Sequence, residues 1–156
     1  MQIDRWLLII PAFITFFVIL WLLISWFLAQ SGGWAALARQ FPASNHVTVP
    51  PPVSPLQAGE MNGCRYKGCL NIGVTPQGMF LSILFLFRFG HPPLLIPWSC
   101  LSPFHAEKAL WMTVYTTTIT GAGRDVRFTL YNKGLVDQLQ GFIAHALAVG
   151  AQVPRA

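Results

Sequence analysis

The chain begins with an uninterrupted apolar run, Trp6 to Ala29, that carries no charged residue over 24 positions. A helix rises ~1.5 Å per residue, so this run reaches ~36 Å and can cross a hydrocarbon core of ~30 Å with some tilt. A core helix of a soluble protein would normally show a polar stripe, and this run shows none. We therefore expect residues 1–30 to form a transmembrane anchor and the rest of the chain to lie beside a bilayer.

The length of the run also favours a retained anchor over a cleaved signal, whose apolar part has only about 7–15 residues. Small residues at 31–33 leave cleavage after Ala29 as the alternative. Trp6 and Trp26 lie near the two ends of the run, where indole rings favour the headgroup level, and Trp21 precedes Trp26. We expect all three tryptophans to help anchor the chain in the membrane.

The charges beside the run give little information on its orientation, because Arg5 precedes it and only Arg39 follows within twenty residues. The body holds all the other Lys and Arg residues in a chain of net charge +5, and it has three cysteines, an odd number. A basic body fits an anionic cytoplasmic leaflet, and an odd number of cysteines does not indicate a full disulfide framework. We expect a single-pass membrane protein with a cytoplasmic body.

Residues 31–41 show apolar side chains at helical spacing and predict a short amphipathic juxtamembrane helix. If this helix lies on the headgroups, Trp34 enters the membrane and Arg39 points outward, so both count as membrane-anchoring residues. The alternative is a helix packed on its own domain. Residues 42–60 contain five prolines and predict an extended spacer.

From Met61 the apolar pattern has a period of two, which predicts strands, and a helix follows at the end of the chain. The alternation or the content of β-branched and aromatic residues predicts five strands: 69–75, 79–87, 94–98, 111–120 and 126–131. Residues 99–108 are expected to be a loop or an irregular sixth strand. A helix is predicted from a cap at Asn132 to Gly150, with a frayed tail over residues 151–156. The short turns require antiparallel pairing, so residues 61–150 form a small α+β domain.

Two apolar segments resemble a known group of proteins. They are Gly78-Met79-Phe80-Leu81-Ser82 and Ile96-Pro97-Trp98-Ser99, and the juxtamembrane SGGWAALARQFP segment resembles the same group. The group consists of short uncharacterised single-span bacterial membrane proteins with a pleckstrin-homology-like (PH-like) domain. The resemblance implies a strongly bent antiparallel barrel or sheet closed by a C-terminal amphipathic helix. It also implies a place in a bacterial inner membrane. Cys100 stands where such strands often have an acidic or polar residue.

Groups that could carry out chemistry are few in the body. Its four acidic residues and four histidines are scattered, and no catalytic or phosphate-binding motif is present, so we expect neither an enzyme nor a cofactor. Cys64, Cys69 and Cys100 could form a thiol or metal module, but the tight CxxC pair of zinc sites is missing and we expect no metal site. The sequence has no basic helix or RNA-binding signature, so we expect no nucleic-acid partner.

We therefore predict a non-enzymatic membrane-anchored interaction or scaffold protein, with the bilayer and other membrane protein subunits as partners. Its concrete form is an accessory subunit of a membrane complex. The alternative is a module that binds anionic lipid through cations at the turns. Five residues are candidates for contact with lipid or a partner: Arg88, Arg124, Lys133, Phe87 and Phe89. By default we expect most other aromatic residues, including Trp111, to belong to the core.

Overall fold

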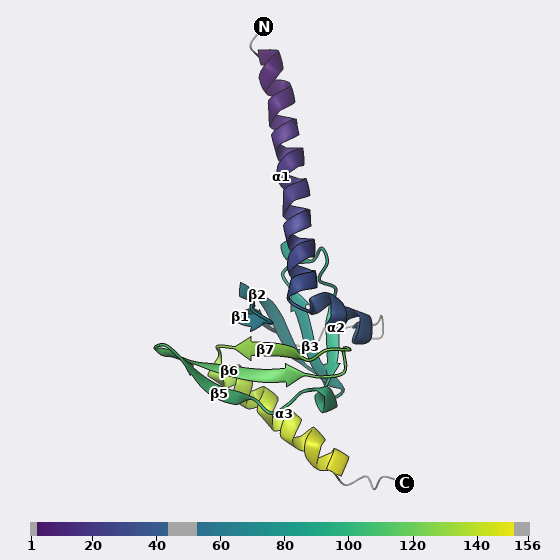
Figure 1. Ribbon diagram of the computed structural model, residues 1–156, viewed down its shortest axis with the longest axis vertical. Coiled ribbons are helices and arrows are strands. Elements are labelled where there is room, and N and C mark those ends of the chain that lie inside the picture. Colours follow the sequence, from purple (N-terminus) through teal and green to yellow (C-terminus); the bar gives the residue numbers. More distant parts are fainter. Residues whose placement is uncertain (1–2, 44–52, 152–156) are drawn as a thin grey trace.

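The structure, a computed structural model, describes residues 3–43 and 53–151. Its first element is α1 (Ile3–Ser31), a single rod that projects from the rest of the molecule (Figure 1). The most apolar 18 residues within Trp6–Ser31 have a mean hydropathy of 2.9, and the rest of the chain does not cover them. The predicted helix is confirmed, and it is long and apolar enough to cross a bilayer.

The short helix α2 (Trp34–Gln40) follows at once, as predicted. Seven strands come next, with short 3₁₀ helices η1 (Phe85–Phe87) and η2 (Trp98–Cys100) before and after the fourth, and α3 (Lys133–Ala151) is last. The strands are β1 (Val53–Met61), β2 (Cys64–Val74), β3 (Gly78–Ile83), β4 (Leu94–Pro97), β5 (His105–Ala109), β6 (Met112–Ile119) and β7 (Val126–Leu130). The α+β class is therefore confirmed.

All seven strands form one antiparallel sheet in the order β4-β3-β2-β1-β7-β6-β5. The two parts of the sheet meet where Gly59–Met61 of β1 pairs with Phe128–Leu130 of β7. In Figure 1, strands β5–β7 run crosswise to β2 and β3, so the sheet is bent as expected. The sheet is open rather than a closed barrel, because β4 and β5 lie at its two edges.

Helix α3 packs against the bent sheet and completes the core. Asn132 caps this helix as predicted, because its Oδ1 accepts a hydrogen bond from the Leu135 amide at 3.3 Å. The core joins fully buried side chains from several strands and from α3, each contributing roughly 1.5–3 kcal/mol by burial. They include Met61, Leu70, Leu81, Phe128, Leu130, Leu139 and Ile143.

The predicted spacer over residues 42–60 is wrong in its second half. Residues 44–52 lie outside the described part of the chain, but Val53–Met61 forms β1. Pro55 is tolerated there because β1 pairs with β7 only at Gly59–Met61, so Pro55 has a strand on one side alone. The sheet domain therefore begins at Val53 and not at Met61.

The predicted strand over residues 79–87 is too long. Strand β3 ends at Ile83, and Phe85–Phe87 turns as η1. The last apolar residues of the segment do not face the core: Phe85 is 73% exposed and Leu86 56% exposed. Strand β5 covers the second half of the segment expected to be a loop or irregular strand, and β2 begins at Cys64, five residues before its predicted start.

Candidate functional site

Helix α1 is joined to the domain by two closely packed glycines, Gly32 and Gly33. Gly33 has φ 85°, a conformation that glycine adopts without strain. A Cβ atom on Gly32 would lie 3.2 Å from the Tyr66 hydroxyl oxygen and 3.2 Å from the Cys64 Cβ. The chain therefore passes from α1 to α2 in close contact with β2, and the span is attached through a packed joint rather than a linker.

An aromatic cluster lies directly beneath this joint. Trp34 is fully buried, and its ring centroid lies 5.8 Å from that of Tyr66 and 5.1 Å from that of His91. The indole Nε1 of Trp34 donates a hydrogen bond to the Pro92 carbonyl at 2.9 Å. Trp34 was expected to anchor the chain in lipid, and this assignment is corrected: protein atoms cover the side chain completely. Of the two interpretations of the short helix, the structure has the one packed on its own domain.

His91 and Tyr66 form a neutral pair in this cluster. The His91 Nδ1 lies 3.2 Å from the Phe89 carbonyl oxygen, which can only accept, so Nδ1 carries the proton and Nε2 accepts from the Tyr66 hydroxyl at 3.2 Å. Burial lowers the pKa of His91, against smaller opposing effects of backbone hydrogen bonds at Phe89 and Phe87. Burial also raises the pKa of Tyr66. Both side chains therefore stay uncharged near neutral pH.

This pair predicts that the protein loses stability in weak acid. Below a pH of about 6.5 the unfolded chain protonates His91 while the folded chain resists, so the free energy of unfolding falls as pH falls. The slope from this group is at most about 1.4 kcal/mol per pH unit. Urea unfolding of the full chain in detergent micelles at several pH values measures it. In the His91→Gln control the slope should decrease, and an unchanged slope would contradict the assignment.

The loop between β3 and β4 lies along the last turns of α1. The Trp21 indole donates to the Leu86 carbonyl at 3.2 Å, and its ring centroid lies 5.0 Å from that of Phe87. Farther along, a Cβ atom on Gly90 would lie 3.3 Å from the Ala29 Cβ. These contacts fix the loop against α1, as Figure 1 shows where the loop rises beside the lower part of that helix.

The position of the loop along α1 sets its depth if α1 spans a bilayer. Counted from Trp6, the about twenty residues that a span requires end at Ser25. The Trp21 contact then lies inside the hydrocarbon boundary and the Gly90 contact outside it. Phe85 and Phe89, which are 73% and 52% exposed, are placed to enter the membrane surface. The Leu86 carbonyl is paired with Trp21, as a backbone group in such surroundings must be.

The other predicted anchoring residues have different environments. Trp6 and Trp26 are 62% and 51% exposed on α1 and are free to contact lipid. Trp21 packs on the loop, and Arg39 is exposed on α2.

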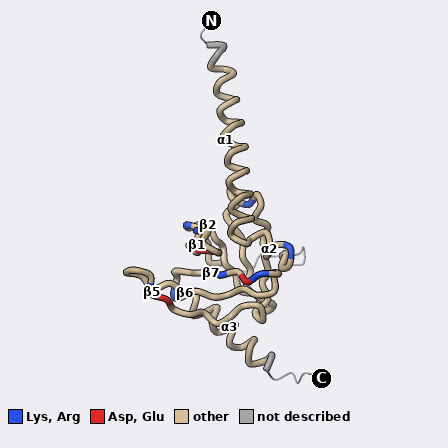
Figure 2. The backbone as a smooth tube through the Cα atoms, viewed as in Figure 1, with Lys and Arg blue, Asp and Glu red and all other residues tan. Residues whose placement is uncertain are grey.

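The three candidate cations have separate surroundings, and Figure 2 shows Lys and Arg residues scattered over the body rather than gathered in one patch. Arg88 is exposed in the loop beside α1. The Arg124 guanidinium donates to the Gln30 carbonyl at 3.3 Å, near the negative end of α1. Lys133 pairs with Asp137 at 2.6 Å on α3, which lies on the opposite side of the sheet from α1.

The structure does not combine the three cysteines into one site. Cys64 and Cys69 line a cavity of ≈240 Å³ beside the end of α1, and Cys100 lies elsewhere, near Gly121. All three are free, and burial raises the pKa of Cys64 and Cys69, which disfavours the reactive thiolate. Within residues 3–43 and 53–151, no three His, Cys, Asp or Glu side chains are grouped to hold a metal ion.

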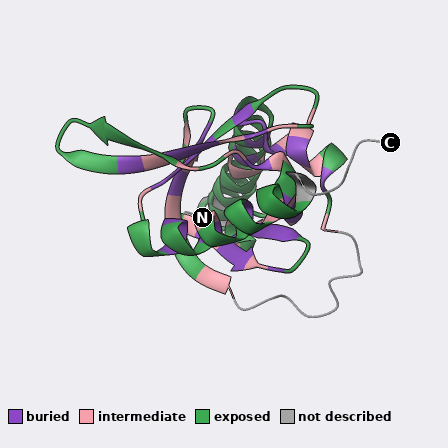
Figure 3. Ribbon diagram, turned by 90° about the horizontal axis from the view of Figure 1, so that it is seen from below, coloured by how far each residue is buried: buried purple, intermediate pink, exposed green. Residues whose placement is uncertain are grey.

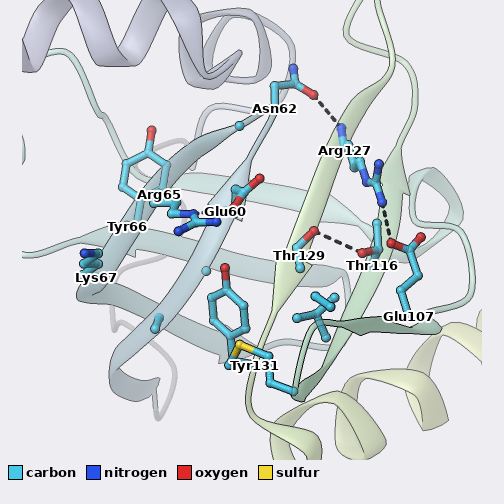
Figure 4. Close-up of a pocket in the computed structure, with 16 residues that line it drawn as sticks. Glu60, Asn62, Arg65, Tyr66, Lys67, Glu107, Thr116, Arg127, Thr129 and Tyr131 are labelled. Carbon is cyan, nitrogen blue, oxygen red and sulfur yellow. Dashed lines mark hydrogen bonds and ion pairs between the residues drawn. The ribbon is translucent and has the colours of Figure 1, made fainter.

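A polar groove of ≈740 Å³ crosses the outer face of the bent sheet (Figure 4). Its walls carry two ion pairs, Arg65 with Glu60 at 3.1 Å and Arg127 with Glu107 at 2.6 Å. All four side chains are partly or largely exposed, so each pair contributes little to stability. Lys67 also lines the groove, which therefore has three basic and two acidic side chains and only a small excess of positive charge.

An apolar hollow of ≈770 Å³ lies between α3 and the turn joining β2 to β3. Trp98 stacks on Phe142 with ring centroids 5.3 Å apart, and its indole donates to the Thr75 carbonyl at 3.0 Å. Gln77 and Val149 lie at the rim. Sequence reasoning missed this hollow, because its walls come from segments about seventy residues apart.

Sequence reasoning also misassigned Trp111. It was expected in a strand and by default in the core, but it lies at the tip of the β5–β6 hairpin and is 89% exposed. The sequence carried no signal for this turn, because residues 109–112 include no Gly, Pro, Asn, Asp or Ser.

The chain matches no protein-family model, no curated protein and no solved structure at a significant level. Function therefore has to be inferred from the fold and its surfaces.

Proposed function

We propose that this chain is a non-enzymatic, single-span membrane protein whose sheet domain is held against the bilayer surface as a scaffold for other membrane protein subunits. The observation that carries the proposal is the double attachment of the domain to α1. Trp34 packs beneath the glycine joint, and the β3–β4 loop packs along Trp21 and Ala29. A domain fixed in this way keeps one orientation relative to the membrane, which favours specific contacts with neighbouring membrane proteins.

The proposal includes a PH-like fold for the sheet domain, a cytoplasmic location for it and a role as an accessory subunit. The strand order β4-β3-β2-β1-β7-β6-β5 followed by α3 supports a PH-like domain. The basic body and the odd number of cysteines support a cytoplasmic domain, and the resemblance of residues 78–82 and 96–99 to bacterial membrane proteins supports a bacterial inner membrane. Fold alone does not define a task, so the accessory-subunit role rests on the fixed placement of the domain.

Anionic lipid is the second candidate ligand, and one observation favours it. Arg88 lies in the loop that reaches the membrane boundary, with the exposed Phe89 next to it. A cation at an anionic surface contributes about 1 kcal/mol. Lys133 does not belong to this surface, because it lies on α3 beyond the sheet.

Depth measurements test the placement of the domain. A polarity-sensitive fluorophore on Leu86→Cys in the full chain should be quenched by spin labels in the acyl chains of the bilayer. The same fluorophore on Leu147→Cys, an exposed position of α3, should not be quenched. Equal quenching at the two positions would mean that the domain does not rest on the membrane as proposed.

The scaffold role is tested by isolating the complex. After extraction in a mild detergent, the full chain should migrate with partner subunits on native sizing. A variant with ten Gly and Ser residues inserted between Ser31 and Gly32 keeps the span and the domain but removes the glycine joint, one of the two attachments, and its association with those partners should weaken. A lone monomer for the unaltered chain would count against the role.

A further inference from the structure

The tip of the β5–β6 hairpin is the most exposed apolar feature of the sheet domain. Ala109 and Met112 form the last pair of the hairpin, so Leu110 and Trp111 alone make the turn. Leu110 is 90% exposed and Trp111 89% exposed, and Met112 adds a half-exposed side chain. Figure 3 shows the hairpin extending from the domain with its end exposed.

The backbone at this tip is also unfavourable for the residues it carries. Leu110 has φ 56°, in the left-handed region. Two-residue hairpin turns with positive φ normally use Gly, Asn or Asp, and another residue there costs ~1 kcal/mol or more. Leu56 also combines a positive φ with exposure, but it is 59% exposed and stands alone, whereas the tip places two large apolar side chains of about 90% exposure side by side. This concentration of exposed apolar area indicates that the two side chains serve a contact.

The same chain carries a complementary surface on its opposite flank. The apolar hollow is walled by Trp98 and Phe142 and extends to Val149 near the end of α3. Figures 1 and 3 agree that the hairpin tip and the C-terminal half of α3 point in opposite directions. In Figure 1 the hairpin runs crosswise to α1 and α3 slants away from α1 toward its C-terminal end, so both elements project to the sides of the domain rather than toward α1.

We propose that copies of this chain associate head to tail in the membrane, the Leu110–Trp111 tip of one copy entering the apolar hollow of the next. This assembly goes beyond the proposed scaffold role and rests on its membrane anchoring, because a shared bilayer aligns the two surfaces. An ordinary tilt of the span, ~20°, brings tip and hollow toward one level. A contact between two different surfaces of one chain builds rings or open chains rather than a closed dimer.

Charge also favours a second copy as the occupant. Within the described residues, helix α3 carries no basic residue in its last turn, and the C-terminal end of a helix carries a partial negative charge. Lys108 lies two residues before the hairpin turn and is exposed. When the tip fills the hollow, Lys108 of one copy approaches the C-terminal end of α3 of the next. A cation there is stabilising, because it interacts favourably with the last carbonyl groups of the helix.

Lipid fits the tip less well than protein does. The hairpin runs at the level of the lower sheet, beyond the end of α1, and does not rise along that helix as the β3–β4 loop does (Figure 1). A Trp side chain removes ~150–250 Å² from water when covered, so this small contact falls well below the ~1,200 Å² of stable interfaces between soluble proteins. The association therefore depends on confinement in the bilayer and should be lost on dilution in detergent.

Disulfide cross-linking in membranes tests the geometry. In the full chain, Ala109→Cys places a thiol beside the tip and Gln77→Cys places one at the rim of the hollow, leaving Leu110 and Trp111 intact. Mild oxidation should give a ladder of dimers, trimers and larger species only when both substitutions are in one chain. Three controls, the native chain and the two single variants, report any cross-linking through Cys64, Cys69 or Cys100.

A third substitution identifies the contact. Trp111→Ser in the double-cysteine chain should reduce the ladder at least tenfold, whereas Leu56→Ser, at another exposed leucine, should leave it unchanged. Dimers from Ala109→Cys alone would show a tip-to-tip contact and overturn the proposal. Adducts with other proteins, labelling of the tip from the lipid phase, or no cross-link would also overturn it. Recovery in the membrane fraction is scored separately, since its loss would contradict the anchoring itself.

Discussion

Replacing Trp34 with alanine is expected to lower the free energy of unfolding by about 3–5 kcal/mol. The indole is fully buried, contacts Tyr66 and His91, and donates to the Pro92 carbonyl. Its removal leaves a cavity beneath the glycine joint and an unpaired carbonyl in the loop that rests on α1. Small domains have total stabilities of roughly 5–15 kcal/mol, so this loss is large.

Urea unfolding of the full chain in detergent micelles, followed by near-ultraviolet circular dichroism, measures the change. Trp34→Phe keeps an aromatic ring but loses the donor, so it should lie between the native chain and Trp34→Ala. Trp26→Ala is the matched control, because that indole is half exposed on α1. Equal effects of Trp34→Ala and Trp26→Ala would show that Trp34 is not a core residue.

Elements set by local patterns could be predicted from the sequence. The apolar run gave α1, and the stripe ending at Gly150 gave α3 with its cap at Asn132, because helical periodicity is visible within a few turns. Strand β7 was also predicted, within one residue, because the apolar residues Val126, Phe128 and Leu130 alternate with polar ones. Strand β1 could not be predicted, since Pro55 and Gly59 oppose a strand locally and only pairing with β2 and β7 compensates.

The site depended on contacts that no local pattern contains. The sequence around a tryptophan next to a span is the same whether lipid or protein covers the indole. Trp34 is covered by protein because Tyr66 and His91 pack against it, and these contacts come from distant parts of the chain. The segment ending at Phe87 was assigned to a strand because it is apolar throughout, but its last residues are apolar because they lie beside α1. Trp111 was expected in the core because it is aromatic, but it lies at an exposed turn.

Replacing Gly78 with alanine is expected to destabilise the domain by more than about 3 kcal/mol, the largest effect predicted for a single methyl group here. The φ angle of Gly78 is not in the left-handed region, so space and not backbone conformation forbids a side chain. A Cβ atom would overlap the Ile96 carbonyl of the neighbouring strand β4. Neither strand can yield, because Thr75 closes the turn through its hydroxyl, which accepts from the Gly78 amide at 3.0 Å and donates to its carbonyl at 2.7 Å.

Unfolding of the full chain in micelles compares this variant with a methyl group added where there is room. Gly141→Ala is the matched control: the position is helical, exposed and has no atom within 4 Å of the new Cβ, so it should stabilise the protein by roughly 0.5–1 kcal/mol. The Thr75–Gly78 turn also forms one wall of the apolar hollow, through Thr75 and Gln77. Gly78→Ala should therefore reduce the head-to-tail cross-links together with stability, whereas Gly141→Ala should preserve both. A stability within about 0.5 kcal/mol of the native chain for Gly78→Ala would refute the close approach of β3 and β4.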